Sequence, residues 1–391
     1  MIKNPVLVVI FLLGIEAGVL FISSRPRCRK YFSVLPSIFW MYFLPMVFST
    51  AGLIDSQSQV YKLIAAYVLP MSLVLLLLSA DLSAIARLGR QALMMMLAGT
   101  LGIMIAVPLV FTFFKPLVGP AMWPGFGALS ASWTGGSANM IAVREALRVP
   151  SEVFTPMVLV DTVVPYVWMA LLVSLAGFQK AFDRWNRVDK KIFEVLAHQT
   201  AGIKVEKKTV LDKRGIAMVF FVGIAGVLFS AALAQQMPSF GNVFTPAAWR
   251  VILASALGVV LSLTPLKKLE RYGTDPIGYF LLFFVLVSIG AGARLVNIGT
   301  SLVLIMAGFC IVIIHGVIVL GVSRLIRAPF FLVVVSSQAN IGGVASAPVV
   351  AGVYQPHLSY VGLLLAVFGN IIGTYVGIIT GYVCRYFSGG S

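Results

Sequence analysis

The chain has 391 residues, of which 60% are hydrophobic and 11% charged. A typical soluble domain carries about 25% charged residues, so this composition excludes an ordinary soluble enzyme. No polar stretch is long enough to fold as a separate domain, which also excludes a receptor with a single membrane anchor. The net charge of +16 is typical of a membrane protein with basic cytoplasmic loops and does not by itself indicate nucleic-acid binding. The three cysteines and three histidines are scattered, which gives no support for a disulfide framework, a metal centre or another cofactor.

Apolar segments follow one another along the whole chain, and most have about the 20 residues that a helix needs to cross a bilayer. They lie at residues 5–23, 36–54, 60–80, 92–114, 124–147, 153–176, 215–236, 246–266, 275–293, 299–321, 329–352 and 359–383. The sequence therefore predicts an all-α polytopic membrane protein. We expect a first repeat at 1–176, a cytoplasmic linker at 177–214 and a second repeat at 215–385. The tail at 386–391 ends in Ser-Gly-Gly-Ser, which is typical of an artificial addition.

The linker contains one stretch with helical spacing of apolar residues, at Ile192, Val195 and Leu196. This spacing is consistent with an amphipathic helix on the inner leaflet, where anionic lipids attract basic side chains. A simple tether between the two repeats is the interpretation that we favour.

The fifth segment of each half differs from the others because small and polar residues cluster in it. Segment 124–147 contains Gly135 and Gly136, and segment 329–352 contains Gly342 and Gly343. A helix that breaks at membrane depth leaves backbone groups that lipid cannot satisfy, so it must face protein or a water-filled cavity. Glycine-interrupted segments at matching positions of two halves are typical of a transporter binding site.

The distribution of charge favours re-entrant hairpins over full crossings for these two segments. Re-entrance places 21 of the 29 Lys and Arg residues on the cytoplasmic side, whereas two full crossings place at most 19 there. Each half then has an odd number of crossings, so the second half inserts upside down relative to the first. We expect ten crossings, two hairpins that enter from opposite faces with tips near the midplane, and both termini outside.

Two polar residues lie at the centre of the segments that follow the hairpins. Asp161 occupies the sixth segment, where a carboxylate costs about 2.5–3.5 kcal/mol to insert and usually serves an ion or proton pathway. Asn370 occupies a similar depth in the twelfth segment and is a candidate counterpart of Asp161. The alternative for Asp161 is a structural role, with its carboxylate hydrogen-bonded within the bundle. The alternative for Asn370 is a hydrogen bond between two helices.

Glycines, hydroxyls and amides around the breaks complete the candidate binding site. Half-helix N-termini attract anionic groups, and unwound carbonyls and hydroxyls bind Na⁺. Packing of small residues between helices is the alternative explanation for the glycines. We expect a Na⁺ site near Asp161, Asn139 and Asn340. The full candidate set for solute and ion binding is Thr134, Gly135, Gly136, Ser137, Asn139, Asp161, Gln338, Asn340, Gly342, Gly343 and Asn370.

Other polar residues in or near the membrane receive a structural interpretation. Asp81 lies at a cytoplasmic helix end with Arg87 and Arg90 and is expected to cap the helix or to form an interfacial ion pair. His315 is expected to be hydrogen-bonded within the bundle rather than to relay protons. Arg144 and Glu145 are expected to mark the point where the first hairpin surfaces. Glu16, inside the first segment, is left without a role.

The polar segments resemble those of a known family. The stretches Ser132–Asn139 and Ser337–Gly343, with Ser79–Leu82 and Gly369-Asn370, resemble the signatures of the "domain of unknown function 819" membrane family over nearly the whole chain. That family is grouped with a superfamily of cation–proton antiporters and anion transporters that includes sodium/glutamate and citrate symporters. The resemblance implies inverted repeats, a homodimer and elevator-type movement. Val344 stands where the first hairpin has Ser137, so the two tips differ chemically.

The expected function is secondary transport of a small polar or anionic organic solute across the cell inner membrane, coupled to Na⁺ or H⁺. The partners are then the solute and membrane lipids, with no nucleic acid, and the protein is not an enzyme. No Gly-x-x-x-x-Gly-Lys-Ser/Thr motif for ATP-driven movement occurs in the chain. The alternatives are an intramembrane hydrolase using Asp161 or Ser137, for which no second carboxylate or histidine partner stands out, and an ion channel.

Overall fold

The computed structural model describes residues 1–28, 31–32, 37–189, 191–200, 212–238, 245–293 and 298–389. Within these ranges the regular secondary structure is helical, apart from an isolated β-bridge between Ile2 and Ile54, and turns and short loops connect the helices. The basic residues Arg29 and Lys30, the centre of the linker and the last two residues of the tail lie outside the described residues.

The described chain has eight helices that are long and apolar enough to cross a membrane. They are α1 (Pro5–Ser23), the run of α4, η2 and α5 (Gln59–Leu78), α7 (Gly89–Val118), α10 (Ser151–Ser174) with its continuation to Trp185, α13 (Lys213–Gln236), α15 (Thr274–Ala291), α16 (Ile298–Ile326) and α19 (Ser359–Ser388). A ninth span results if α14 (Pro246–Ser262) is counted with η5 (Pro265–Tyr272), from which it is bent by 97°. The shorter α3 (Ser37–Thr50) lies at the remaining predicted crossing. The prediction of an all-helical, multi-pass membrane protein is therefore confirmed.

Both of the glycine-rich segments are broken helices. The first consists of α8 (Trp123–Gly135) and α9 (Ser137–Ala146), and the second of α17 (Phe330–Ile341) and α18 (Gly343–Tyr354). Gly136 has a φ of 78° and Gly343 a φ of 62°, which is left-handed backbone that only glycine adopts without a steric cost. The breaks lie at the predicted glycine pairs.

The contacts divide the chain into two compact units. Unit 1 contains residues 1–79, 144–162 and 209–301, and unit 2 contains residues 80–143, 163–208 and 302–391. Each unit combines segments from both halves of the chain, whereas the predicted repeats 1–176 and 215–385 follow chain order. The repeat boundaries stay a prediction, because sharing a unit says nothing of sequence symmetry.

Unit 1 packs around α5 (Leu69–Leu78), which contacts α13, α14 and α15. Small residues allow this close approach, as expected for helices that associate in lipid. A side chain added at Gly223 would meet Met71, and one added at Gly258 would meet Val74 and Leu77. Glycine at these positions therefore sets the distance between α5 and its neighbours.

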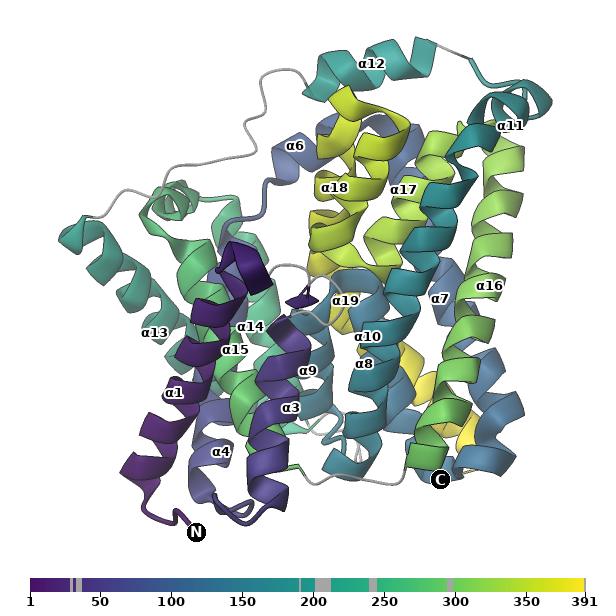
Figure 1. Ribbon diagram of the computed structural model, residues 1–391. Helices are drawn as coiled ribbons and strands as arrows, with labels where there is room; N and C mark the ends of the chain where they lie inside the picture. The colour runs from purple at the N-terminus through teal and green to yellow at the C-terminus, as the bar shows by residue number, and fades with distance from the viewer. Residues whose placement is uncertain are drawn as a thin grey trace. The chain divides into compact units, whose positions relative to one another are not determined.

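Unit 2 packs around α19, which contacts α7, α8, α17 and α18 (Figure 1). Three glycines spaced four residues apart, Gly369, Gly373 and Gly377, form one face of α19 against α8. A Cβ added at Gly373 would lie 2.8 Å from the Cα of Gly135, so the two backbones are in direct contact. The helix-packing explanation of glycine thus applies to α19.

The linker contains a helix, α12 (Lys191–Thr200), at the place where amphipathic spacing was noted. Its Leu196 is fully buried in the core of unit 2, and the rings of Phe193 and Phe331 lie 6.1 Å apart. In Figure 1, α12 lies across the end of α18. Leu196 and Phe193 therefore contact protein, whereas Val195 is exposed, and the tether and inner-leaflet interpretations both stay predictions.

Substitution of Gly373 by alanine is expected to destabilise unit 2, because the new methyl group would overlap the backbone of α8. Overpacking of this kind costs about 1–3 kcal/mol. The measurement is thermal unfolding of the purified protein in detergent. Gly321→Ala in α16 is the matched control, since nothing lies within 4 Å of its added methyl group. Equal stability of the two variants would contradict the described packing.

Candidate functional site

The first half-helix, α8, runs along the C-terminal half of α19 and ends near the midpoint of that helix. At the start of α8, the Trp123 ring lies 6.0 Å from the Tyr382 ring, close to the C-terminal end of α19. At the end of α8, Gly135 contacts Gly369 and Gly373. Since α19 has 30 residues, Gly373 lies at its middle. The first break is therefore level with the centre of a helix long enough to span a membrane.

The second broken helix folds back on itself. Phe330 is the first residue of α17 and Tyr354 the last residue of α18, and their ring centroids are 5.9 Å apart. The chain therefore reverses direction at the break. The helix α18 runs antiparallel to the N-terminal half of α19. A Cβ added at Gly352 would meet Ser359, and one added at Gly362 would meet Ala347.

The two breaks meet beside the centre of α19. A Cβ added at Gly343 would lie 3.9 Å from the Cα of Gly136, and one added at Gly136 would lie 3.6 Å from the side-chain amide of Asn370. The half-helices thus approach from opposite ends of α19, and their tips face each other at Asn370. We take this meeting point as the candidate functional site.

Asparagine side chains satisfy the backbone at the first break. The Asn139 amide donates to the Gly135 carbonyl at 2.5 Å and to the Asn370 carbonyl at 3.1 Å, and the Thr374 hydroxyl donates to the Asn139 amide oxygen at 2.5 Å. With the Asn370 side chain oriented to satisfy both of its ends, its amide nitrogen donates to the Gly135 carbonyl at 2.6 Å. Two amides therefore cap the last carbonyl of α8, at the negative end of that half-helix.

Asn340 holds the second broken helix against α7. Its amide nitrogen donates to the carbonyls of Ser336 and Met96 at 3.0 and 3.2 Å, and its oxygen accepts from the Thr100 hydroxyl at 3.0 Å. Asn139 and Asn340 thus belong to separate networks, and their described bonds are to backbone carbonyls, threonine hydroxyls and, for Asn340, the Met96 sulfur. The predicted Na⁺ site that combines them is not visible in these bonds and stays a prediction.

His315 is hydrogen-bonded on both ring nitrogens, as expected for a bundle histidine. Nδ1 lies 3.0 Å from the Gly99 carbonyl and Nε2 lies 3.0 Å from the Ser337 hydroxyl. A carbonyl only accepts, so Nδ1 carries the proton and Nε2 of the neutral ring accepts from Ser337. The Trp168 indole also donates to this hydroxyl, at 2.9 Å. The histidine therefore fixes α17 to α7 and α16.

Gln338 presents an unsatisfied acceptor near the second break. The side chain is fully buried, and its amide nitrogen donates across the break to the Ser346 hydroxyl at 2.8 Å. Its Oε1 atom has no hydrogen-bond partner among the described residues. A buried polar atom without a partner is unfavourable, so a cation or a donor group of a ligand would be stabilised there.

The other predicted site residues lie in different surroundings. The Thr134 hydroxyl donates to the Ser130 carbonyl of its own helix at 2.9 Å, and Ser137 is the partly exposed first residue of α9. Asp161 lies on α10 in the part that belongs to unit 1, whereas the breaks belong to unit 2. Its assignment to the ion site stays a prediction. The Asp81 side chain caps α6 (Leu82–Arg87) as expected, accepting from the Ala84 N–H.

The hydroxyl partners Thr100 and Thr374 could not be identified from the sequence, because threonines in a long apolar helix carry no signal of their own. Glu16 was noted and left without a role. It is fully buried in α1, and neither of its carboxylate oxygens has a hydrogen-bond partner among the described residues. An ionisable group inside a membrane helix is a functional candidate in its own right.

Comparison with known proteins places this architecture in a family. The family described as "Protein of unknown function (DUF819)" matches residues 10–387. The chain belongs to this family. A relative in Bacillus subtilis (strain 168), "Uncharacterized membrane protein YjcL", is 27% identical over 351 residues, which cover 86% of each chain. Membership confirms the family resemblance, while the grouping of DUF819 with sodium/glutamate symporters stays an expectation.

The hydrogen bond between Asn139 and Thr374 predicts energetic coupling in a double-mutant cycle. Asn139→Ala and Thr374→Val are expected to couple by about 0.6 kcal/mol and at most about 1.7 kcal/mol, the range for polar contacts between membrane helices. The readout is the free energy of unfolding in detergent. Thr100→Val is the matched partner, since its described contacts are with Asn340 and Met96, and it should be additive with Asn139→Ala.

Proposed function

We propose that this DUF819 protein is a secondary transporter that couples Na⁺ or H⁺ to the movement of a small polar or anionic organic solute. The observation that carries the proposal is the meeting of two glycine breaks beside Asn370, halfway along α19. Irregular backbone at membrane depth is tolerated where it is buried in protein or lines a cavity, and transporters use it to bind solute and ion. The wider family and its many apolar helices agree with transport in general.

The polarity of the half-helices gives the site its chemistry. The helices α9 and α18 begin at the breaks, and α8 and α17 end there. Helix N-termini carry partial positive charge and C-termini partial negative charge, so one site offers surroundings for an anionic group and for a cation. The unpaired Oε1 of Gln338 adds an acceptor for the cation or for a donor group of the solute. In the proposal, Ser137, Asn370 and the glycine backbones complete the contacts.

Re-entrance of the first broken helix is part of the proposal, and a cavity in unit 1 supports it. Residues 56–58 and 144–151 line the same cavity, so these two stretches lie on one side of the membrane. Between them the chain passes through two long apolar helices, Gln59–Leu78 and Gly89–Val118. If both of these helices cross, they return the chain to its starting side, and in the proposal α8 and α9 together enter and leave on that side.

In the proposal, unit 2 is the transport core of an elevator-type movement, because it contains both breaks and α19. Unit 1 is the scaffold, and Asp161 lies where α10 passes from unit 1 to unit 2, since the boundary falls after Thr162. A homodimer in the cell inner membrane completes the proposal. An intramembrane hydrolase using Asp161 or Ser137 and an ion channel are the alternatives, and no described contact favours either.

A thermal-shift screen of the purified protein against small organic anions and polar solutes tests transport-type binding. A solute at 100 times its Kd is expected to stabilise the protein by about 2.7 kcal/mol. Replacement of Na⁺ by K⁺ at two pH values then separates Na⁺ from H⁺ coupling. Asn370→Ala is expected to abolish the stabilisation and uptake into proteoliposomes, and Asp161→Asn is expected to remove the ion dependence.

Arg87→Gln, at an exposed position outside the breaks, is the control and should keep both responses. Full uptake by a folded Asn370→Ala protein would contradict the assigned site, and full ion dependence of Asp161→Asn would contradict that residue's role. Peptide cleavage that Asp161→Asn abolishes would favour the hydrolase, and conductance far above transporter turnover would favour the channel.

Single cysteines in a variant that lacks the native cysteines test re-entrance. Ala121→Cys precedes α8 and Pro150→Cys follows α9, and both positions are exposed. A membrane-impermeant maleimide should label both from the same side of oriented vesicles, because the hairpin returns to the face from which it enters. Lys267→Cys provides a reference that is expected on the opposite side. Labelling of positions 121 and 150 from opposite sides would show that the segment crosses the membrane.

A further inference from the structure

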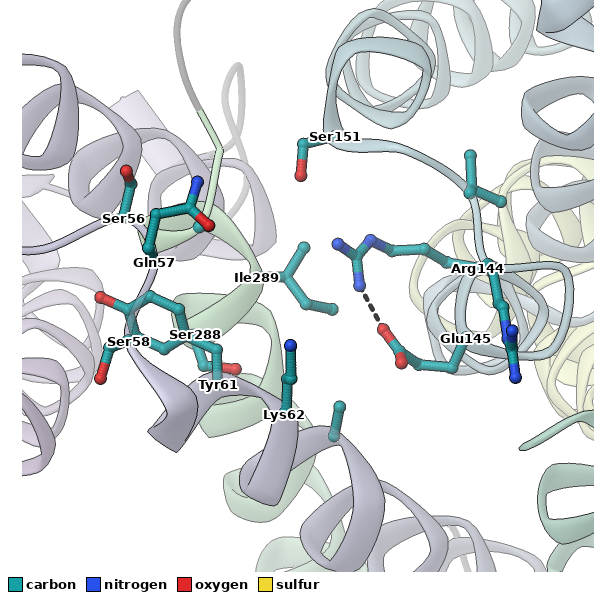
Figure 2. A pocket seen from close by; sticks show the side chains of 14 residues that line it. Ser56, Gln57, Ser58, Tyr61, Lys62, Arg144, Glu145, Ser151, Ser288 and Ile289 are labelled. Carbon is teal, nitrogen blue, oxygen red and sulfur yellow. Dashed lines mark hydrogen bonds and ion pairs between the residues drawn. The ribbon is translucent and has the colours of Figure 1, made fainter. Parts of the chain in front are cut away.

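Unit 1 contains a cavity of about 310 Å³ that is separate from the breaks. Its lining comes from residues 56–65, from the end of α9 with the connection to α10, and from the end of α15, all of which belong to unit 1. Figure 2 shows that Lys62 and Arg144 reach toward the centre from opposite walls. From the sequence, Arg144 and Glu145 are expected to mark the point where the first hairpin reaches the membrane surface, and no ligand is predicted for them.

The lining has an excess of positive charge. Lys62, Arg144 and Arg148 are cationic, and Glu145 is the acidic member of the lining. Hydroxyl groups of Ser56, Ser58 and Ser151 lie on the same walls. Guanidinium groups bind carboxylate and phosphate through paired hydrogen bonds, and hydroxyls add further donors. The chemistry of the wall therefore matches an oxyanion.

The guanidinium of Arg144 is positioned by its neighbours, and its Nε atom still lacks a partner. Arg144 pairs with Glu145, and its guanidinium lies 5.3 Å from the centre of the Phe154 ring. The side chain is 15% exposed, and Nε is buried with no hydrogen-bond partner among the described residues. Glu145 therefore does not satisfy every donor of this arginine, whose guanidinium lines the cavity.

Arg148 is held at the cavity by the turn that ends α9. Its φ is 51°, its N–H donates to the Glu145 carbonyl at 3.3 Å, and the N–H of Val149 donates to the Arg144 carbonyl at 2.9 Å. These two bonds define a Schellman motif, in which the left-handed position is usually glycine. Arg187 has the same motif in unit 2, with a φ of 53°. The chain therefore offers a matched pair of arginines, of which one lines the cavity.

We propose that this cavity binds a small oxyanion, in the form of a carboxylate or phosphate group, between Arg144, Arg148 and Lys62. The inference concerns a site apart from the breaks, and it does not depend on the proposed transport. The group belongs either to a soluble anion or to the headgroup of an anionic lipid. Glu145 competes with the ligand for Arg144.

The test measures the thermal unfolding midpoint of the full chain in nanodiscs of phosphatidylcholine. Succinate and inorganic phosphate are titrated separately at an ionic strength held constant with chloride. A parallel arm replaces part of the phosphatidylcholine with phosphatidylglycerol. A saturable rise with a soluble anion identifies a soluble ligand, and a rise with phosphatidylglycerol alone identifies a headgroup.

Arg148→Gly removes the guanidinium and supplies the residue that the Schellman turn prefers, so the variant is expected to fold. It should bind the anion about tenfold to hundredfold more weakly, since a hydrogen bond to a charged group is lost. Arg187→Gly makes the same change at the matched turn and should bind like the unmodified protein. Glu145→Gln should bind more tightly, because it frees Arg144.

Three results would overturn the proposal. The first is no stabilisation by either soluble anion or by phosphatidylglycerol. The second is a response that Arg148→Gly retains in full. The third is an equal loss in Arg148→Gly and Arg187→Gly, which would show that net charge rather than the cavity causes the response.

Discussion

The inability of lipid to accept or donate hydrogen bonds is the constraint on which the rest of this structure depends. A helix that stops at membrane depth must find partners for its terminal backbone groups within the protein. The end of α8 finds them in the amides of Asn139 and Asn370, which both donate to the carbonyl of Gly135. This requirement explains why polar side chains and glycines occur together at the break, and why α19 must lie against it.

The polar side chains at the two breaks have different hydrogen-bond partners. At the first break, the amide nitrogens of Asn139 and Asn370 are used to hold backbone. The Asn370 side chain therefore forms a hydrogen bond between helices, which is the alternative role that the sequence allowed for it. At the second break, Asn340 bonds to α7 and Gln338 keeps an unpaired oxygen. Among the described residues, the second break therefore has an unpaired hydrogen-bond acceptor, the Oε1 atom of Gln338. The two tips thus differ in their polar groups, as the replacement of Ser137 by Val344 also indicates.

Much of the architecture could be predicted from the sequence, because span length and glycine breaks are local properties. The positions of the crossings, the two breaks and the family all follow from segments of about 20 residues. The partners of the polar groups could not be predicted, since Asn139 and Asn370 are 231 residues apart and apolar periodicity does not specify which helices pack together. The same holds for Thr374, for the burial of Leu196 and for the cavity that brings Lys62 to Arg144. Asp161 has a strong local signal, but the partner of its carboxylate is likewise a property of the packing and not of the segment around it.

The glycine face of α19 also determines how this region can move. At Gly369, Gly373 and Gly377 the backbone of α19 lies directly against α8, so this part of the interface contains no long side chains of α19 whose rotamers could change as one helix slides past the other. Close backbone contact of this kind resists sliding of α8 along α19. Gly136, which lies between the two half-helices with a φ of 78°, is the position where the direction of α9 relative to α8 can change at the lowest steric cost.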